Sequence, residues 1–175
     1  GPNPTRGTYQ VEVLQLATAT AAASSSRLGS AINPSATLNA SGISTPITAG
    51  TFTVNGAIIT VDPTTQSLND VLAIVNGSSA GVTATYDGVS DKVVFENTAP
   101  GNTNLINLGA SGNTSNFLSA INLLGATQST SPGGSTIVSS TRNLGAVDQA
   151  DALNTVSFAS GAISAGSFII NGTTI

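Results

Sequence analysis

The clearest structural signal in the chain is Gly50-Thr51-Phe52-Thr53-Val54-Asn55-Gly56-Ala57-Ile58-Ile59-Thr60-Val61-Asp62. Apolar and polar residues alternate on both sides of its central Asn-Gly pair, which is the period-2 pattern of half-buried strands. Asn and Gly both tolerate the positive φ angles of a type I′ turn, so this dipeptide is a strong hairpin signal. The stretch therefore predicts an antiparallel hairpin with Phe52 in the core.

The same unit returns at the far end of the chain, as Gly166–Ile175. Phe168 corresponds to Phe52 at an offset of 116 residues (168 − 52), and Asn171 corresponds to Asn55 at the same offset. A period this long indicates a duplicated domain, because solenoid units are much shorter. Phe168 is expected in the core as well. The second copy is truncated after its turn, so its hairpin must pair with another segment.

That other segment is expected to be Thr8–Leu16, in which Tyr9, Val11 and Val13 alternate with polar residues. This alternation predicts a strand, and Tyr9 is in phase with its buried positions. The phase shifts by one residue at Leu14, as at a bulge or where a strand moves from one packed face to another. The following run, Ala17–Ser26, has no period. It is interpreted as an extended surface segment; a polar strand continuing the first, a surface helix and a mobile loop are the structural alternatives, and a subunit contact is an alternative role.

A helix is predicted after the first hairpin. Ser67 and Asp70 have the spacing of a capping box at a helix N-terminus. The helix is expected to end at Asn76-Gly77, with Gly77 as a left-handed C-cap. Its apolar stripe follows the spacing i, i+3, i+4, i+7 and consists of Leu68, Val71, Leu72 and Val75.

A second hairpin is expected next, with strands over Gly81–Tyr86 and Lys92–Glu96 and a turn over Asp87–Asp91. Tyr86 is in phase with the buried side and is interpreted as a core residue. Hairpin, helix and hairpin together form a compact α+β module whose helix covers one face of the sheet.

Four weaker signals complete the pattern. Leu38 and Ile43 suggest a short strand, and Thr114 or Ser115 is the expected cap of a second short helix. Ser129–Ser135 is the expected linker or loop tip, and Ile137-Val138 the expected edge strand. The buried stripe of the second helix is expected to be Phe117, Leu118, Ile121 and Leu124.

The expected fold class is α+β and β-rich, with antiparallel hairpins, one or two short covering helices and two related subdomains. Residues 1–6 are interpreted as a tag scar or linker, because of Gly1-Pro2, and residues 7–35 as the first strand with its surface segment. Residues 36–128 form the α+β module, 129–150 a loop or linker, and 151–175 the truncated second copy. An excised piece of a longer protein is the simplest explanation of this organisation.

The composition excludes several functions. Charged residues make up 7% of the chain, and four cations against eight acids give a net charge of −4, which argues against nucleic-acid binding. Apolar runs are too short to span a membrane. Cys and His are absent, which removes thiolate and imidazole ligands and every triad with a His base. A Ser-Lys dyad would have to use Lys92, the only lysine. We assign no catalytic, cofactor-binding or metal-binding residue and expect no enzyme.

Two patterns that suggest a site have simpler explanations. Asp87 and Asp91 flank one turn and could bind Ca²⁺, but turn chemistry at Asp87 and a solvated strand end at Asp91 explain them better. Four Asn-X-Ser/Thr sequons are attributed to chance in a chain rich in these residues. They begin at Asn39, Asn76, Asn113 and Asn171.

An ordered series of segments resembles the flagellar hook IN motif: Gly50–Gly56, Ser67–Leu72, Ile74–Asn76 and Ala80–Asp87. The Ile-Asn pair of that motif is Ile170-Asn171 in the second copy and Val54-Asn55 in the first. Thr8–Ala17 resembles the strand that enters the head of the flagellar filament cap family, hook-associated protein 2, and Gly112–Leu118 with Leu123–Gly125 resembles the end of its module. The resemblance covers roughly residues 7–125 and 151–175.

This resemblance implies the head portion of a cap that sits outside the cell, at the tip of the bacterial flagellum. Such proteins form a ring of subunits and help exported flagellin to assemble, which needs no active site. The implied partners are copies of the same protein and flagellin, and an adhesive role at a host surface or mucin is left open. The alternatives are a binding domain of a secreted adhesin and a hook–filament junction protein, with an enzyme as a distant third.

Overall fold

The computed structural model describes residues 1, 28–101, 104–145, 147, 152–153, 156, 158–161 and 163–175. The Tyr9 strand and the Ala17–Ser26 segment lie outside these residues. The fold is β-rich α+β, as the sequence predicts, with antiparallel sheets of two, four and two strands. No helix among the described residues is long and apolar enough to span a membrane.

The first hairpin forms as its alternation predicts. Strand β1 (Gly50–Val54) pairs with β2 (Ala57–Val61) around a turn in which Asn55 and Gly56 have φ angles of 49° and 84°. Both angles are positive, as a type I′ turn requires. The face toward the core carries Phe52, Val54, Ile59 and Val61, all buried.

Helix α1 (Leu68–Gly77) begins at the predicted capping box and buries the predicted stripe. The helix ends at Gly77, as expected, but the expected left-handed cap was wrong. The C-cap is Ser78, whose hydroxyl donates a hydrogen bond to the Val75 carbonyl at 2.7 Å. A serine side chain therefore satisfies a terminal carbonyl, so no left-handed glycine is needed at that position.

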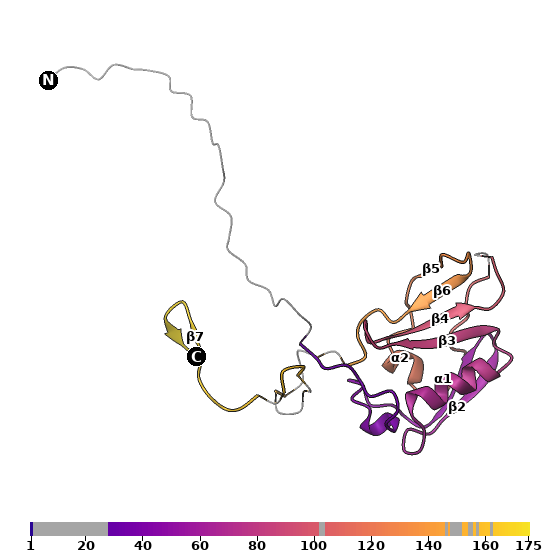
Figure 1. Cartoon of the computed structure of the whole chain (residues 1–175), viewed down its shortest axis with the longest axis horizontal. Coiled ribbons are helices and arrows are strands. Elements are labelled where there is room, and N and C mark those ends of the chain that lie inside the picture. Colours follow the sequence, from indigo (N-terminus) through magenta and orange to yellow (C-terminus); the bar gives the residue numbers. More distant parts are fainter. Residues whose placement is uncertain are drawn as a thin grey trace.

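The main sheet has the order β3-β4-β6-β5 (Figure 1). Its strands are β3 (Val82–Asp87), β4 (Lys92–Asn97), β5 (Gln128–Thr130) and β6 (Thr136–Ser139). Helix α1 packs against β3 and also contacts β2, so it lies between the sheet and the first hairpin. One continuous apolar core extends from Ile32 to Leu144 and joins these layers. We call residues 32–144 the body.

The body confirms one expectation about residues 129–150 and corrects another. Of the two alternatives for Ser129–Ser135, linker or loop tip, the loop tip is right: residues 131–135 form the turn of the β5–β6 hairpin, and the first two residues of the segment belong to β5. The expected edge strand, β6, lies inside the sheet between β4 and β5, with Val138 buried. Alternation is hard to recognise in strands this short, and only the pairing with β4 shows where β6 belongs.

Two more local expectations need correction. Residues Leu38–Ala40 form a 3₁₀ turn, η1, in place of a short strand. Helix α2 (Phe117–Ala120) has Asn116 at its N-cap position, without a cap bond from that side chain, but the Ser115 hydroxyl accepts a hydrogen bond from the Phe117 N–H at 3.2 Å, as one of the two expected caps. Thr114 instead accepts a hydrogen bond from the Thr51 N–H at 2.9 Å, which ties this segment to β1.

The buried stripe predicted for α2 is correct at three of its four positions. Phe117, Leu118 and Ile121 are buried, whereas Leu124 is 57% exposed. Leu123 is buried in its place, because the helix ends after one turn and its period no longer sets the direction of later side chains.

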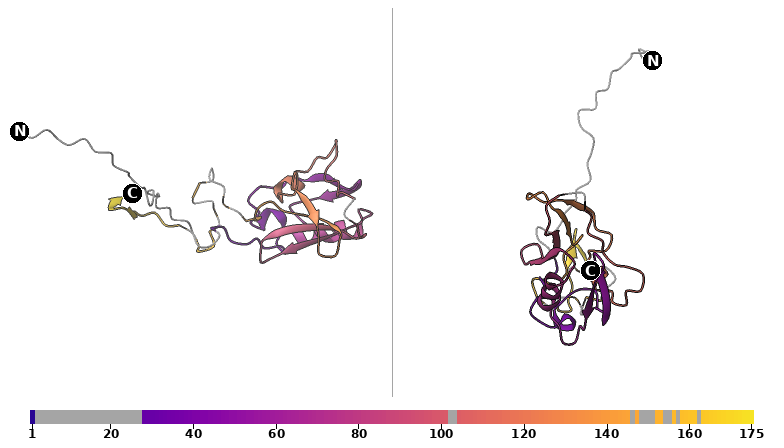
Figure 2. Two further views of the ribbon diagram at one scale, coloured as in Figure 1. Left: turned by 90° about the horizontal axis from the view of Figure 1, so that it is seen from above. Right: turned by 90° about the vertical axis from the view of Figure 1, so that its right-hand side faces the viewer.

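The second hairpin, β7 (Ile169–Ile170) with β8 (Thr173–Thr174), lies away from the body in Figure 1 and in the left view of Figure 2. Its turn residues Asn171 and Gly172 have φ angles of 50° and 80°, close to those of the first copy. Phe168, which was expected in the core, is 59% exposed. The local turn is therefore repeated, but its burial is not.

Candidate functional site

The turn between β3 and β4 holds the two carboxylates considered for calcium. Asp87 is exposed and accepts hydrogen bonds from the Ser90 hydroxyl at 2.6 Å and the Val89 N–H at 2.9 Å. The Ser90 hydroxyl and, secondly, the Val89 N–H stabilise the anion, so the pKa of Asp87 is lowered from its ordinary value. This side chain holds its own turn together, as turn chemistry predicts.

Asp91 has a different environment from the one expected. It is fully buried, and its φ of 54° places it in the left-handed region. One carboxylate oxygen accepts from the Tyr86 hydroxyl at 2.7 Å and the Ile32 N–H at 3.2 Å. The other accepts from the Gly145 N–H at 2.9 Å. The expectation of a solvated strand end was wrong, because the first residue of the body, Ile32, and the residue after its end, Gly145, both bind this carboxylate.

Within the described ranges, no group of three or more acidic side chains is placed to hold a metal ion. Asp87 and Asp91 each bind donors of the protein itself rather than converging on one point. Tyr86 is half-buried against the core and uses its hydroxyl on Asp91. The pair therefore acts as a structural element in this fold.

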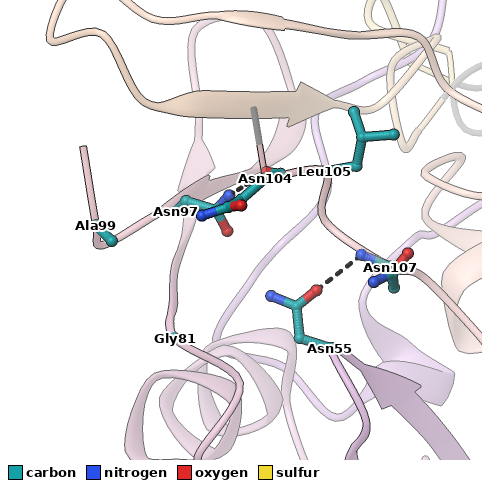
Figure 3. Close-up of a pocket in the computed structure, with 7 residues that line it drawn as sticks. All are labelled: Asn55, Gly81, Asn97, Ala99, Asn104, Leu105 and Asn107. Atoms are coloured by element: carbon teal, nitrogen blue, oxygen red, sulfur yellow. Dashed lines mark hydrogen bonds between the residues drawn. The ribbon is translucent and has the colours of Figure 1, made fainter. Parts of the chain in front are cut away.

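A polar node forms at the tip of the first hairpin. The side-chain amide of Asn55 donates to the Ala80 carbonyl at 2.8 Å, and its oxygen accepts from the Asn107 N–H at 2.8 Å (Figure 3). The Asn55 N–H also donates to the Asn107 carbonyl at 2.8 Å. The Asn of the Asn-Gly turn thus holds the hairpin to the loop after α1 and to the loop after β4.

An open hollow of about 560 Å³ lies beside this node. Asn97 and Asn104 stand across from Asn55 and Asn107 in Figure 3. The Asn97 amide donates to the Asn104 carbonyl at 2.6 Å. The described lining has amide groups and no charged side chain: Asn55, Gly81, Asn97, Ala99, Asn104, Leu105 and Asn107. Such groups donate and accept hydrogen bonds without charge, so the hollow suits a neutral polar ligand. Sequence analysis missed it, although Asn recurs between residues 97 and 107.

A smaller hollow of about 370 Å³ lies between α2 and the loop before it. Leu108, Leu118 and Leu124 form its apolar wall, and Asn113 and Asn116 are among its polar residues. Asn116 is already engaged, because its oxygen accepts from the Thr48 N–H at 2.8 Å.

The four sequon asparagines occupy unrelated places. Asn39 is exposed in η1, and Asn113 lines the smaller hollow. The Asn76 side chain is bound on both sides to the backbone of Ala84, at 2.6 and 3.0 Å. Asn171 is exposed in its turn.

Lys92, the lysine that a Ser-Lys dyad would have to use, is half-buried at the start of β4.

The second hairpin exposes an apolar face. Phe168, Ile170 and Ile175 are 59%, 56% and 61% exposed, and we call these three residues the hairpin face.

Comparison with known proteins adds no assignment to these features: no family model, no curated protein and no solved structure matches the chain.

Proposed function

We propose that this protein is a structural assembly protein, the head region of a flagellar filament cap that assembles with copies of itself at the filament tip and promotes flagellin polymerisation there. The observation that carries the proposal is the ordered series of IN-type segments, closed by a second copy of its hairpin. The proposed location is extracellular, and the proposed activity is mechanical and non-enzymatic.

Two structural features support this proposal. The two hairpins share turn geometry and register, as a duplicated module would: Phe168 and Ile175 exchange backbone hydrogen bonds at 2.8 and 3.2 Å, and Phe52 faces Ile59. In addition, the chain enters and leaves the body at one place, where Gly145 packs against Ser30. A body with adjacent ends projects from its flanking segments, which suits a head that presents surfaces to other subunits.

The test is genetic complementation. The gene that encodes this chain is expressed in a flagellated strain that lacks its own cap gene, and filaments are counted by electron microscopy. We expect filament growth to return and flagellin monomers in the medium to fall. A protein that is exported at normal levels but leaves the cells without filaments would contradict the proposal.

The alternative is a binding domain of a secreted adhesin, favoured by the uncharged hollow beside Asn55. Binding of the purified protein to immobilised mucin or glycans, measured alongside complementation, separates the readings. Binding with restored filaments adds an adhesive role to the cap, whereas binding without restored filaments favours the adhesin. Rescue only of a strain lacking a hook–filament junction protein would assign that neighbouring role.

A further inference from the structure

We propose that the smaller hollow, between α2 and the loop before it, binds an aliphatic residue of another polypeptide, with the side-chain amide of Asn113 pairing with the backbone of that residue. This inference adds a binding site and a kind of partner that the proposed function does not specify, and it does not depend on that function. Three observations carry it: an apolar space left open by a glycine, an amide without a partner, and the way in which other amides of this protein bind peptide groups.

The hollow has room because residue 109 is a glycine, with a φ of 79°. A Cβ at this position would lie 3.7 Å from Leu124 Cδ1, 3.9 Å from Leu118 Cδ1 and 3.5 Å from Asn113 Nδ2, so it would point into the hollow. The Gly109 N–H donates to the Thr53 carbonyl at 2.9 Å, which holds this part of the loop on β1. A volume of about 370 Å³ is near the lower end of the range for ligand sites, so the hollow suits one small group.

The lining selects an uncharged aliphatic group. Leu108, Leu118 and Leu124 form the apolar wall, and none of the described lining residues is charged. A charged side chain placed here would lose its hydration without gaining a counter-ion, whereas an aliphatic one is favoured by leaving water. Leu124 is 57% exposed, so a bound residue would cover apolar surface that the body itself leaves in solvent.

Asn113 is the polar group that the hollow offers to a partner. Within the described body, its side-chain amide has no hydrogen-bond partner. The loop that carries it is held in place, because the N–H groups of Thr114 and Ser115 both donate to the Thr51 carbonyl, at 2.9 and 3.0 Å. The amide therefore lies at a fixed place beside an apolar space, where it can donate and accept a hydrogen bond at once.

Two other amides of the body show which partner such a group takes. The Asn76 side chain accepts from the Ala84 N–H at 2.6 Å and donates to the Ala84 carbonyl at 3.0 Å. The Gln128 side chain pairs in the same way with the N–H and carbonyl of Ile106, both at 2.8 Å. Each amide thus binds the backbone of one residue as a neighbouring strand would. We expect Asn113 to pair likewise with an incoming residue, while the side chain of that residue enters the hollow.

The probe for this site is N-acetyl-L-leucine methylamide, a single leucine with a peptide group on each side. It is titrated into the isotope-labelled full chain and followed by NMR. We expect saturable shifts of the Gly109 and Ser119 backbone amides and of the Asn113 side-chain amide, with a Kd that is roughly millimolar for a ligand of this size. The glycine analogue lacks the aliphatic side chain and isoamyl alcohol lacks the peptide groups, so each should bind about tenfold more weakly or worse.

Two variants with matched controls locate the binding. Gly109→Ala places a methyl group in the hollow and should weaken binding of the probe several-fold. Gly112→Ala is its control, because a φ of 96° brings the same backbone strain but nothing lies within 4 Å of the new Cβ; binding should not change. Asn113→Asp replaces the donor by a charge and should also weaken binding. Asn39→Asp, at an exposed position outside the hollow, adds the same charge and should leave binding intact.

The dispersed amide spectrum of the body shows in each case that the variant is folded. Shifts that do not saturate, or that are as large in Gly109→Ala as in the unaltered chain, would overturn the proposed site. Isoamyl alcohol that binds as tightly as the leucine probe would overturn the recognition of a peptide group. Undiminished binding by Asn113→Asp would do the same.

Discussion

The carboxylate of Asp91 accepts a hydrogen bond from the backbone N–H of Gly145 at 2.9 Å. A buried side chain in the turn between β3 and β4 thereby holds the residue at which the chain leaves the body. The Asp91 carbonyl also accepts from the Leu144 N–H at 2.9 Å, and a Cβ on Gly145 would collide with the Ser30 carbonyl. Together with the bond from the Ile32 N–H, these contacts make Asp91 the residue that holds the two ends of the body together; we call this set of contacts the clasp.

Asp91→Asn should lower the free energy of unfolding by about 1–3 kcal/mol, because an amide has one acceptor oxygen and leaves donors on one side unpaired. Asp91→Ala should cost more, since it removes all the hydrogen bonds to the carboxylate and places alanine at a positive φ. Urea denaturation of the full chain measures both. Asp87→Asn, in the same turn but exposed, is the control with the smaller effect. Equal effects at the two positions would contradict the clasp.

The stacked rings of Phe52 and Phe117 link the first hairpin to α2, at an interplanar angle of 18°. Phe117→Ala should destabilise the protein by about 3–5 kcal/mol, because it leaves a cavity against a fully buried ring. Leu124→Ala should change stability by no more than about 0.5 kcal/mol, since that side chain is mostly in solvent. Thermal unfolding distinguishes the two. A large loss of stability from Leu124→Ala would show that Leu124 belongs to the buried stripe after all.

Gly77 and Gly81, on either side of the turn after α1, should respond to alanine with opposite signs. Gly77 is helical and has open space where a Cβ would lie, so Gly77→Ala should stabilise the protein by about 0.5–1 kcal/mol. Gly81 has a φ of 64°, so Gly81→Ala should destabilise by about 1–2 kcal/mol. Denaturant midpoints measure both. Destabilisation by Gly77→Ala would contradict this expectation and support the left-handed C-cap predicted from the sequence.

The capping box predicts a pH dependence. Asp70 accepts from the Ser67 N–H at 2.9 Å and from its hydroxyl at 2.7 Å, and the backbone bond is the first cause of the lowered pKa of Asp70. Because the folded pKa lies below the unfolded one, the stabilisation is complete above the unfolded value. It disappears as the pH falls through the folded pKa.

The stability difference between the unaltered chain and Asp70→Asn should therefore be constant at neutral pH and shrink below about pH 4. Unfolding midpoints between pH 7 and pH 2.5 measure it. Thr60→Ser, on the exposed face of β2, is the control that should give no pH-dependent difference. A difference that persists unchanged at the lowest pH would show that the carboxylate charge is not the stabilising element.

The local structure was predictable where a short stretch carries its own signal. The Asn55-Gly56 turn, the Ser67–Asp70 capping box and the stripe from Leu68 to Val75 all formed as predicted. Each depends on steric preference or on hydrogen bonds between residues at most four positions apart, so the sequence window contains the whole cause. The expected roles at the flagellum remain predictions.

The candidate site was harder to predict, because its residues are distant in sequence. Asn55 meets Asn107 only after the loop following β4 returns to the hairpin tip. Val138 is interior only because β6 inserts between β4 and β5. Burial and strand order depend on these long-range contacts, which neither periodicity nor turn signals contain.

The two phenylalanines of the repeat show the division most clearly. Alternation and Asn-Gly turns place Phe52 and Phe168 at the same position in the same hairpin register, and both hairpins could be predicted from these local signals. Their burial could not: Phe52 is covered by Phe117, whereas Phe168 is exposed. A turn is fixed by its own φ angles, but burial requires a second surface, which local sequence cannot supply.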